Sequence, residues 1–413
     1  MLMRMMQWMI AGVLVLLPVQ THWLISQPRV LGSVWEFGSA RLLVMECIVA
    51  GLALVLWLPW WRARSFRARV ATIVGIAGIF VWSVMVSGGA IVALVHGVHA
   101  VCALLLGVLL FQSVTLFGSR WVLSWFVAGG VLWAGLGLVQ WFTQSVIAST
   151  YLGIAAHAPE VAGDAVVMVR DTRMLRVYGP MPHPNIFGGL MVAYCYAALL
   201  LLRVLSPGAR VHRALVVAAL TLTSVALVLS FSRSAWLAGI VLLLVAVSWR
   251  AWKVWIRTLA VPAIAVVIVV LLLGSGITSR LQTHTPLESQ SRNERVESVQ
   301  DGLSLVAQAP ALGTGLGLAT ASLHANDDAR VGWSLQPPHF TPLLALVELG
   351  FVGVIIFGFC VRFLPWHLGL LVLIPGLFFD HYLWSLPAGM TVLTAIWILS
   401  TIQARLALES TEC

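Results

Sequence analysis

Apolar stretches of about 20 residues, the length a membrane helix needs, recur from one end of this chain to the other. Such a stretch, wound as a helix, crosses a hydrocarbon core about 30 Å thick. Only 9% of the residues are charged and 60% are hydrophobic, whereas soluble domains carry about 25% charged residues. The runs lack the alternation of barrel strands, so their backbone hydrogen bonds must be satisfied within helices. We therefore predict an all-α, polytopic integral membrane protein.

We expect one transmembrane domain that covers residues 1–413 and contains about twelve spans. An apolar run after Arg4 resembles a signal peptide, but no small-residue cleavage site follows it and more spans do, which favours a retained first helix. The expected spans lie near 7–25, 39–60, 70–87, 89–112, 121–142, 184–203, 214–231, 234–249, 258–274, 342–361, 366–380 and 388–404.

Basic residues indicate the orientation of these spans. They follow the even-numbered spans, as Arg62, Arg64, Arg67, Arg69, Arg203, Arg210, Arg213, Arg250, Lys253, Arg257 and Arg362. Because Lys and Arg are enriched in cytoplasmic loops, both termini are predicted to be cytoplasmic. The long segments 143–183 and 275–341 would then face the periplasm from a multi-pass protein of the cell inner membrane. The second of these loops lies between spans nine and ten.

Both outer loops carry more arginine than this topology requires. The residues are Arg170, Arg173 and Arg176 in the first loop and Arg280, Arg292, Arg295 and Arg330 in the second. A bound anion would explain them; neutralisation by neighbouring Asp and Glu residues is an equally good explanation for any one of them. The net charge of +9 follows largely from topology, so nucleic acid is not an expected partner. The five cysteines show no CxxC spacing, and neither a disulfide framework nor a metal site is expected.

Three arginines are candidates for binding a phosphate group. Arg233 lies in the tight hairpin LSFSRSAWLAG at the outer end of the seventh span, while Arg292 and Arg295 open an amphipathic segment that ends at Pro310. A guanidinium group remains charged and can donate two parallel hydrogen bonds to one phosphate. Snorkelling of Arg233 to the membrane surface is the structural alternative.

The glycines that follow this segment could also approach a phosphate. Gly313, Gly315 and Gly317 alternate in GTGLG, which permits close approach of the backbone. A flexible turn between the loop and the next span is the alternative.

His339 is the candidate general base. It stands in QPPHF, immediately before the span that begins at Thr341, and the prolines restrict the approach of the chain. An imidazole has an ordinary pKa near 6.5, which suits proton transfer at neutral pH. A packing or hydrogen-bonding role is the alternative for a lone histidine at a membrane surface.

Polar residues at the outer ends of two other spans could contribute to the same site. His183 and Asn185 flank Pro184 at the start of span six, where a proline-led helix start is the alternative. Asp380 and His381 belong to DHYLW at the end of span eleven, where aromatic residues also suit the membrane interface. Asp327 and Asp328 could bind a divalent metal, but adjacent loop carboxylates are commonly just solvated, and no metal is expected.

The order of these elements resembles the O-antigen ligase and polymerase superfamily. The resemblance rests on Arg295, Pro310, Gly313 to Gly317, His339, Glu348 and Gly350, on Ser232 and Arg233 before the eighth span, and on RVYGPMPHPNIFGG at the start of span six. It covers residues 170–350 by motif and the whole chain by topology. Two positions depart from the family pattern: Val299 replaces the usual Trp four residues after the loop arginine, and Phe340 replaces the Asn that often follows the histidine.

The resemblance implies a GT-C-like fold and a metal-independent glycosyltransferase without a cofactor. Its donor would be an undecaprenyl-diphosphate-linked glycan, and its acceptor a lipid A core hydroxyl or another glycan, among membrane lipids and on the periplasmic face. His339 would deprotonate the acceptor, and Arg295 and Arg233 would stabilise the departing diphosphate. Binding contributions would come from Arg292, Arg176, His183, Asn185, Gly313, Gly315, Asp380 and His381.

Other functions within and outside this superfamily remain open. A ligase is favoured over a polymerase by the position of the loop and its histidine, and the absence of a sizeable extra domain disfavours a protein acceptor. A transporter of lipid-linked glycans is the alternative from another class. Against it, the sequence shows no inverted repeat and no ionisable residue clearly at mid-membrane.

Overall fold

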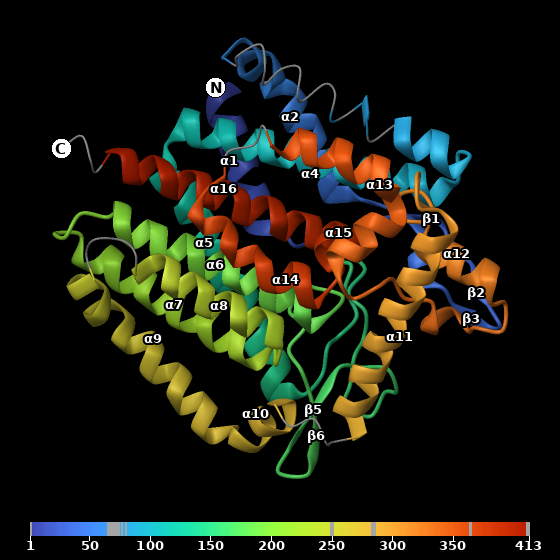
Figure 1. The fold of residues 1–413 in the computed structure, drawn as a ribbon. Helices are drawn as coiled ribbons and strands as arrows, with labels where there is room; N and C mark the ends of the chain where they lie inside the picture. Colours follow the sequence, from blue (N-terminus) through green and yellow to red (C-terminus); the bar gives the residue numbers. More distant parts are fainter. Residues whose placement is uncertain are drawn as a thin grey trace.

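Helices form most of the computed structural model (Figure 1), which describes residues 2–63, 75, 77–78, 81–247, 252–281, 286–362 and 366–409. The α-helices are α1 (Leu2–Leu16), α2 (Val44–Ala63), α4 (Ile91–Phe117), α5 (Ser119–Thr143), α6 (Pro184–Val204), α7 (Arg210–Leu229), α8 (Arg233–Val247), α9 (Trp252–Leu272), α10 (Gly274–Leu281), α11 (Pro286–Gln308), α12 (Ala319–Asn326), α13 (Thr341–Val361), α14 (Ile374–Phe379), α15 (Tyr382–Ser385) and α16 (Pro387–Glu409). The 3-10 helices are η1 (Glu36–Gly38), η2 (Gly332–Ser334) and η3 (Leu368–Leu373).

Six strands pair as three small antiparallel hairpins or ribbons. The pairs are β1 (His22–Ser26) with β4 (Ala40–Leu43), β2 (Arg29–Val30) with β3 (Ser33–Val34), and β5 (Val166–Val169) with β6 (Thr172–Leu175). These strands lie in the connections between long helices. Together with α11 and α12 they lie on one side of the bundle, away from the two chain termini (Figure 1).

Six helices in the described part of the chain are long and apolar enough to cross a membrane. They are α4, α5, α6, α7, α13 and α16. A seventh crossing is formed if α9 and α10, which meet at an 80° bend, are counted as one broken span. Four shorter apolar helices lie at Met3–Leu16, Val44–Leu56, Arg233–Ala246 and Leu368–Phe379. The mostly helical fold of a polytopic membrane protein is confirmed; the count of twelve and the loop orientation remain predictions.

Three expected spans differ in form from continuous helices. The second, 39–60, begins with strand β4 (Ala40–Leu43), and its helix α2 starts only at Val44. The first, 7–25, is helical only to Leu16, because Pro18 cannot extend the helix, and the chain continues into β1. The eleventh, 366–380, is the 3-10 helix η3 followed by the short α14, with Pro375 at the start of α14. Part of the expected span 70–87, and the expected cytoplasmic residues Arg64, Arg67, Arg69 and Arg250, lie outside the described residues.

Helix α6 is the central element of the bundle. Its apolar window is 94% buried, and it packs against α5, α7, α8 and α16. Small residues allow this close packing: a Cβ on Gly188 would lie 2.6 Å from the Ala235 side chain, and one on Gly189 would lie 2.5 Å from the Tyr382 hydroxyl. The position of α6 fixes the residues at its N-terminus, His183 and Asn185, relative to α8 and to the chain around Tyr382.

Helix α13 is bent where it meets the glycine loop. Gly350 interrupts the helix with a φ of 63°, and the loop beside it donates hydrogen bonds from Thr314 N to Val347 O at 2.8 Å and from Gly315 N to Glu348 O at 3.0 Å. A Cβ on Gly313 would lie 2.5 Å from the backbone nitrogen of Gly350. The glycines therefore let two backbones touch, which holds the loop against the middle of α13.

Candidate active site

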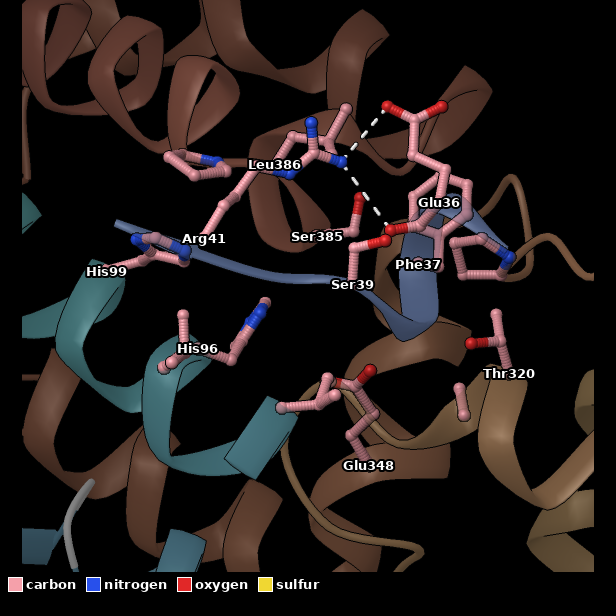
Figure 2. Close-up of a pocket in the computed structure, with 16 residues that line it drawn as sticks. Glu36, Phe37, Ser39, Arg41, His96, His99, Thr320, Glu348, Ser385 and Leu386 are labelled. Carbon is pink, nitrogen blue, oxygen red and sulfur yellow. Dashed lines mark hydrogen bonds and ion pairs between the residues drawn. The ribbon is translucent and has the colours of Figure 1, made fainter. Parts of the chain in front are cut away.

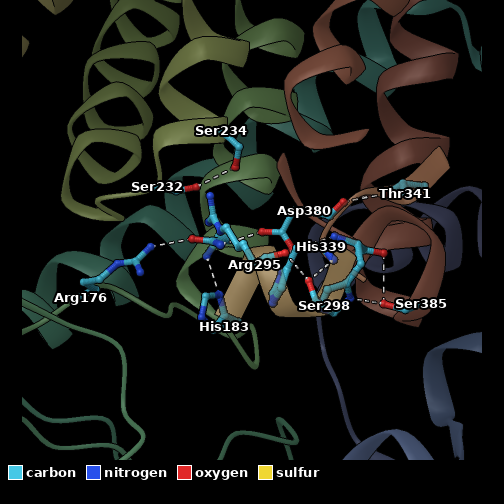
Figure 3. A network of polar contacts seen from close by, with 12 residues as sticks. Arg176, His183, Ser232, Ser234, Arg295, Ser298, His339, Thr341, Asp380 and Ser385 are labelled. Carbon is cyan, nitrogen blue, oxygen red and sulfur yellow. Dashed lines mark hydrogen bonds and ion pairs between the residues drawn. The ribbon is translucent and has the colours of Figure 1, made fainter. Parts of the chain in front are cut away.

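Asp380 lies at the centre of a polar network at the helix ends (Figure 3). It follows α14 and is only 4% exposed. Its Oδ2 accepts a hydrogen bond of 2.7 Å from Asn185 Nδ2, and its Oδ1 accepts one of 2.9 Å from the backbone nitrogen of His381. Burial alone would raise the pKa of Asp380, but contacts with His339, His381 and His183 outweigh it and lower this pKa. Asp380 is therefore a carboxylate at neutral pH.

His339 faces this carboxylate. Its Nδ1 lies 3.9 Å from Asp380 Oδ1, an ion-pair distance that is too long for a hydrogen bond. The same Nδ1 is buried and has no hydrogen-bond partner among the described residues, while the side chain as a whole is 22% exposed. Catalytic hydrogen bonds are often long before substrate binds. A small movement of the ring would place an Nδ1–H on Asp380 and leave Nε2 as the proton acceptor.

The backbone around His339 is held by α11. The His339 amide donates to Ser298 Oγ at 3.4 Å, and Ser298 Oγ donates to the Arg295 carbonyl at 2.9 Å. Ser298 is one helical turn after Arg295, so α11 positions both Arg295 and the backbone of His339. Figure 3 places the Arg295 side chain among His183, Asp380 and His339.

His381 is the third member of a compact group with His339 and Asp380. Its Nδ1 lies 2.6 Å from Ser385 Oγ, and this hydroxyl also donates to the His381 carbonyl at 3.1 Å. The hydroxyl has one proton, so the arrangement favours an Nδ1–H on His381 and a lone pair on Nε2. Burial, and then the proximity of His339, lower the pKa of His381 to about 3, and the ring is neutral at pH 7.

Asp380, His339 and His381 also form the kind of donor set that binds transition metals. One ligand atom from each lies within 4.8 Å of the others. Imidazole nitrogens with one carboxylate suit zinc and related ions. The sequence-based expectation that no metal takes part is not tested by this geometry.

Arg176 supports the network from the side opposite to Ser385. It is 5% exposed; its Nε donates to the Ser230 carbonyl at 2.8 Å and its Nη2 to Asn185 Oδ1 at 2.7 Å. Because the Asn185 oxygen faces Arg176, the Asn185 amide nitrogen must face Asp380. His183 is the residue that caps the start of α6, and its Nδ1 accepts a hydrogen bond of 3.1 Å from the backbone nitrogen of Asn185. Arg176, Asn185, Asp380 and His339 therefore follow one another in a line of contacts.

The other candidate arginines make contacts of their own or are exposed. Arg292 is exposed on α11, one turn before Arg295. Arg233 opens α8 and its Nη1 donates to the Arg280 carbonyl at 3.3 Å, while Arg280 Nε donates to the Phe231 carbonyl at 3.2 Å. Arg280 is thus a neighbour of Arg233, which its sequence separation did not indicate. Arg330 is instead paired with Asp301 at 2.7 Å, as the neutralisation hypothesis predicts.

The alternating glycines have an internal packing role in this structure. Gly313 N donates to the Ala309 carbonyl at 3.0 Å, and Gly315 N donates to the Glu348 carbonyl at 3.0 Å. Amides that are used in this way are not available to cradle a phosphate. Glu348 in turn accepts from Trp384 Nε1 at 2.8 Å, so the spacing of loop, glutamate and glycine reflects how this region folds.

The described helices and the buried polar network at their ends are those of a polytopic membrane protein with a candidate site. Residues 214–358, from α7 into α13, match the family model described as O-antigen ligase. The match contains Arg233, Arg295 and His339 and confirms the resemblance to the O-antigen ligase and polymerase superfamily. It supports a ligase-type or polymerase-type function in O-antigen processing. No curated protein and no solved structure matches the chain.

Proposed function

We propose that this protein is an O-antigen ligase-type glycosyltransferase. It transfers a glycan from undecaprenyl diphosphate to a hydroxyl of the lipid A core, on the periplasmic face of the inner membrane. The observation that carries this proposal is His339 beside the buried Asp380 carboxylate, with Arg295 in the same network (Figure 3). This arrangement can accept a proton and stabilise negative charge at the same place.

The reaction is a displacement at the anomeric carbon of the donor sugar. The acceptor oxygen forms a bond to this carbon while the bond to the diphosphate oxygen breaks, and the diphosphate leaves with the electron pair. The acceptor proton passes to His339 Nε2. Asp380 stabilises the imidazolium that forms and keeps the ring oriented, which is the role of a carboxylate behind a catalytic imidazole.

Arginines stabilise the leaving diphosphate. Arg295 approaches from α11, and Arg233 lies at the start of α8; Arg292 extends the positive charge toward solvent. A hydrogen bond to a charged group contributes about 1.5–3 kcal/mol, and more charge develops on the diphosphate as the bond breaks. Arg176 acts through Asn185, whose orientation it fixes, so we assign it a positioning role.

The transfer requires no metal in this proposal. A lipid diphosphate is a good leaving group that needs charge stabilisation more than protonation, and guanidinium groups supply that charge. A transition metal at His339, Asp380 and His381 would engage the imidazole that serves as base. We therefore expect activity to persist in EDTA.

The test is a transfer assay with purified protein in liposomes, EDTA and an undecaprenyl-diphosphate-linked glycan. Lipid A core and free lipid-linked glycan are offered as separate acceptors. Wild type is compared with His339→Ala and with His212→Ala, a matched control at an exposed histidine on α7. The ligase proposal is supported if wild type and His212→Ala transfer glycan to lipid A core and His339→Ala does not.

Other outcomes overturn all or part of the proposal. Extended lipid-linked chains would identify a polymerase of the same superfamily. Equal transfer by all three proteins would refute the role of His339. Absence of transfer, with wild type still moving lipid-linked glycan across liposomes, would replace the enzyme with a transporter.

A further inference from the structure

A second polar space lies beside the active site. It is open to solvent at its mouth, and its interior of about 50 Å³ has room for about four water molecules. Figure 2 shows side chains from the N-terminal segment, α4 and α13 turned toward it. Its polar lining includes Glu36, Ser39, Arg41, His96, His99, Thr320, Glu348 and Ser385.

This cavity adjoins the catalytic group at two points. Ser385 lines it and lies 2.6 Å from His381 Nδ1. Pro337, two residues before His339, also lines it. The Phe37 ring, another part of the lining, lies edge-on to the His381 ring with centroids 5.4 Å apart. A molecule in the cavity would thus be next to the histidine pair while remaining outside the arginine network.

The charge of this cavity differs from that of the arginine network. Arg41 is its only arginine or lysine among the lining residues, and it is paired with Glu36 at 3.2 Å. His99 Nδ1 lies 2.7 Å from Glu46 Oε1. The lining combines hydroxyl, carboxylate and imidazole groups with the Phe37 ring, which suits the hydroxyls and the apolar ring face of a sugar. A phosphate would find little uncompensated positive charge here.

We propose that this cavity binds the terminal, uncharged sugar of the acceptor. The inference rests on the proposed transferase function and adds a division of the site to it. A displacement requires the nucleophile and the leaving group on opposite sides of the reacting carbon. From Asp380, where the contacts of Arg176 and Asn185 arrive, a second branch runs through the His381 backbone nitrogen and the His381 ring to Ser385 (Figure 3). Donor diphosphate on the arginine side and acceptor sugar beyond Ser385 satisfy this requirement with His339 between them.

The experiment measures acceptor and donor dependence separately. The variants are Arg41→Ala and Phe37→Ala, both in the cavity lining, with Arg29→Ala as the control. Arg29 is an exposed residue of β2 in the same N-terminal segment, and it is absent from the lining. The assays are transfer to lipid A core at varied acceptor concentration, transfer at varied donor concentration, and thermal unfolding in detergent. We expect about a tenfold rise in acceptor KM for each cavity variant, with donor KM and unfolding temperature unchanged.

The results separate this inference from the proposed function. If wild type transfers glycan and both cavity variants keep the wild-type acceptor KM, the cavity is not the acceptor site although the transferase proposal stands. A rise in donor KM instead would place the donor in the cavity and also refute the inference. Lack of transfer by wild type refutes the proposed function itself. If Arg41→Ala proves unstable, Arg41→Lys is tested in its place. Because Arg41→Lys keeps the positive charge, its acceptor KM should return to the wild-type value.

Discussion

Replacing Asp380 by Asn tests the central electrostatic argument. In the wild type the carboxylate accepts hydrogen bonds from Asn185 Nδ2 and from the backbone nitrogen of His381. An asparagine has one oxygen and one NH₂ group, so whichever way it turns, one donor must face another donor. The substitution also removes the negative charge 3.9 Å from His339 Nδ1. The protein keeps a side chain of nearly the same shape while it loses the counter-charge.

The magnitude follows from the bond that the transition state would make. A hydrogen bond between the imidazolium and a carboxylate contributes about 1.5–3 kcal/mol, and each 1.36 kcal/mol changes a rate about tenfold. We therefore expect kcat for Asp380→Asn to fall by about 10- to 150-fold. The steric change is small, so acceptor and donor KM should remain within about threefold, which is about 0.65 kcal/mol.

The assay is steady-state transfer in liposomes, with thermal unfolding as the control for folding. Asn185→Ala removes a donor to the same carboxylate but retains its charge, and it should reduce kcat less than Asp380→Asn. A kcat for Asp380→Asn within threefold of wild type would refute the argument that Asp380 stabilises protonated His339. Each kcat is calculated per folded protein, so that a loss of folding is not counted as a loss of catalysis.

Three further perturbations follow from the same structure. Gly350→Ala should lower the free energy of unfolding by about 1–3 kcal/mol, because its Cβ would meet Ala311 O at 2.4 Å in a backbone with φ 63°. Gly358→Ala in the same helix has open space around its Cβ and should leave the stability unchanged. Unfolding temperatures of the two variants test this difference. Arg295→Lys should reduce kcat about tenfold, because lysine cannot donate paired hydrogen bonds to one phosphate. Arg210→Lys, at an exposed site on α7, should leave kcat unchanged. Equal kcat values for the two variants would exclude phosphate binding by Arg295. His381, whose pKa is lowered to about 3, stays neutral in the fold and takes up a proton on unfolding below about pH 6.5, so stability falls as pH falls. Wild type should thus lose about 2 kcal/mol more than His381→Gln between pH 7 and pH 5, measured by unfolding temperature; identical losses would contradict the burial argument.

The sequence predicted the class of fold because hydrophobic length is a local property. Spans such as 184–203 and 388–404 correspond closely to α6 and α16. The form of the weaker spans depended on tertiary context, as in η3 and α14, where a broken segment is accepted because neighbouring helices surround it. Hydropathy cannot distinguish such a segment from a continuous helix.

The sequence identified most polar residues of the site but not their arrangement. His339 and Asp380 are separated by about forty positions, and nothing local indicates that they face each other. Asn185 and Arg176 were expected to bind substrate directly, yet each uses its polar atoms to orient the next residue in the line. Those contacts depend on where α6 and α14 end in space. Pairing at helix ends is therefore information that only the fold supplies.

The two departures from the family pattern fit this arrangement of roles. Val299 is a partly buried member of the hydrophobic cluster formed with Leu305, Leu343 and Leu344, and the Phe340 ring lies 5.4 Å from the Phe378 ring. Both substitutions therefore alter packing at the junction of α11 and α13. The groups that would handle the proton lie on His339, the residue before Phe340, and on Asp380, which is held by Asn185 and the His381 backbone nitrogen. A change of packing residue at 299 or 340 is compatible with the same chemistry because neither side chain belongs to that line of contacts.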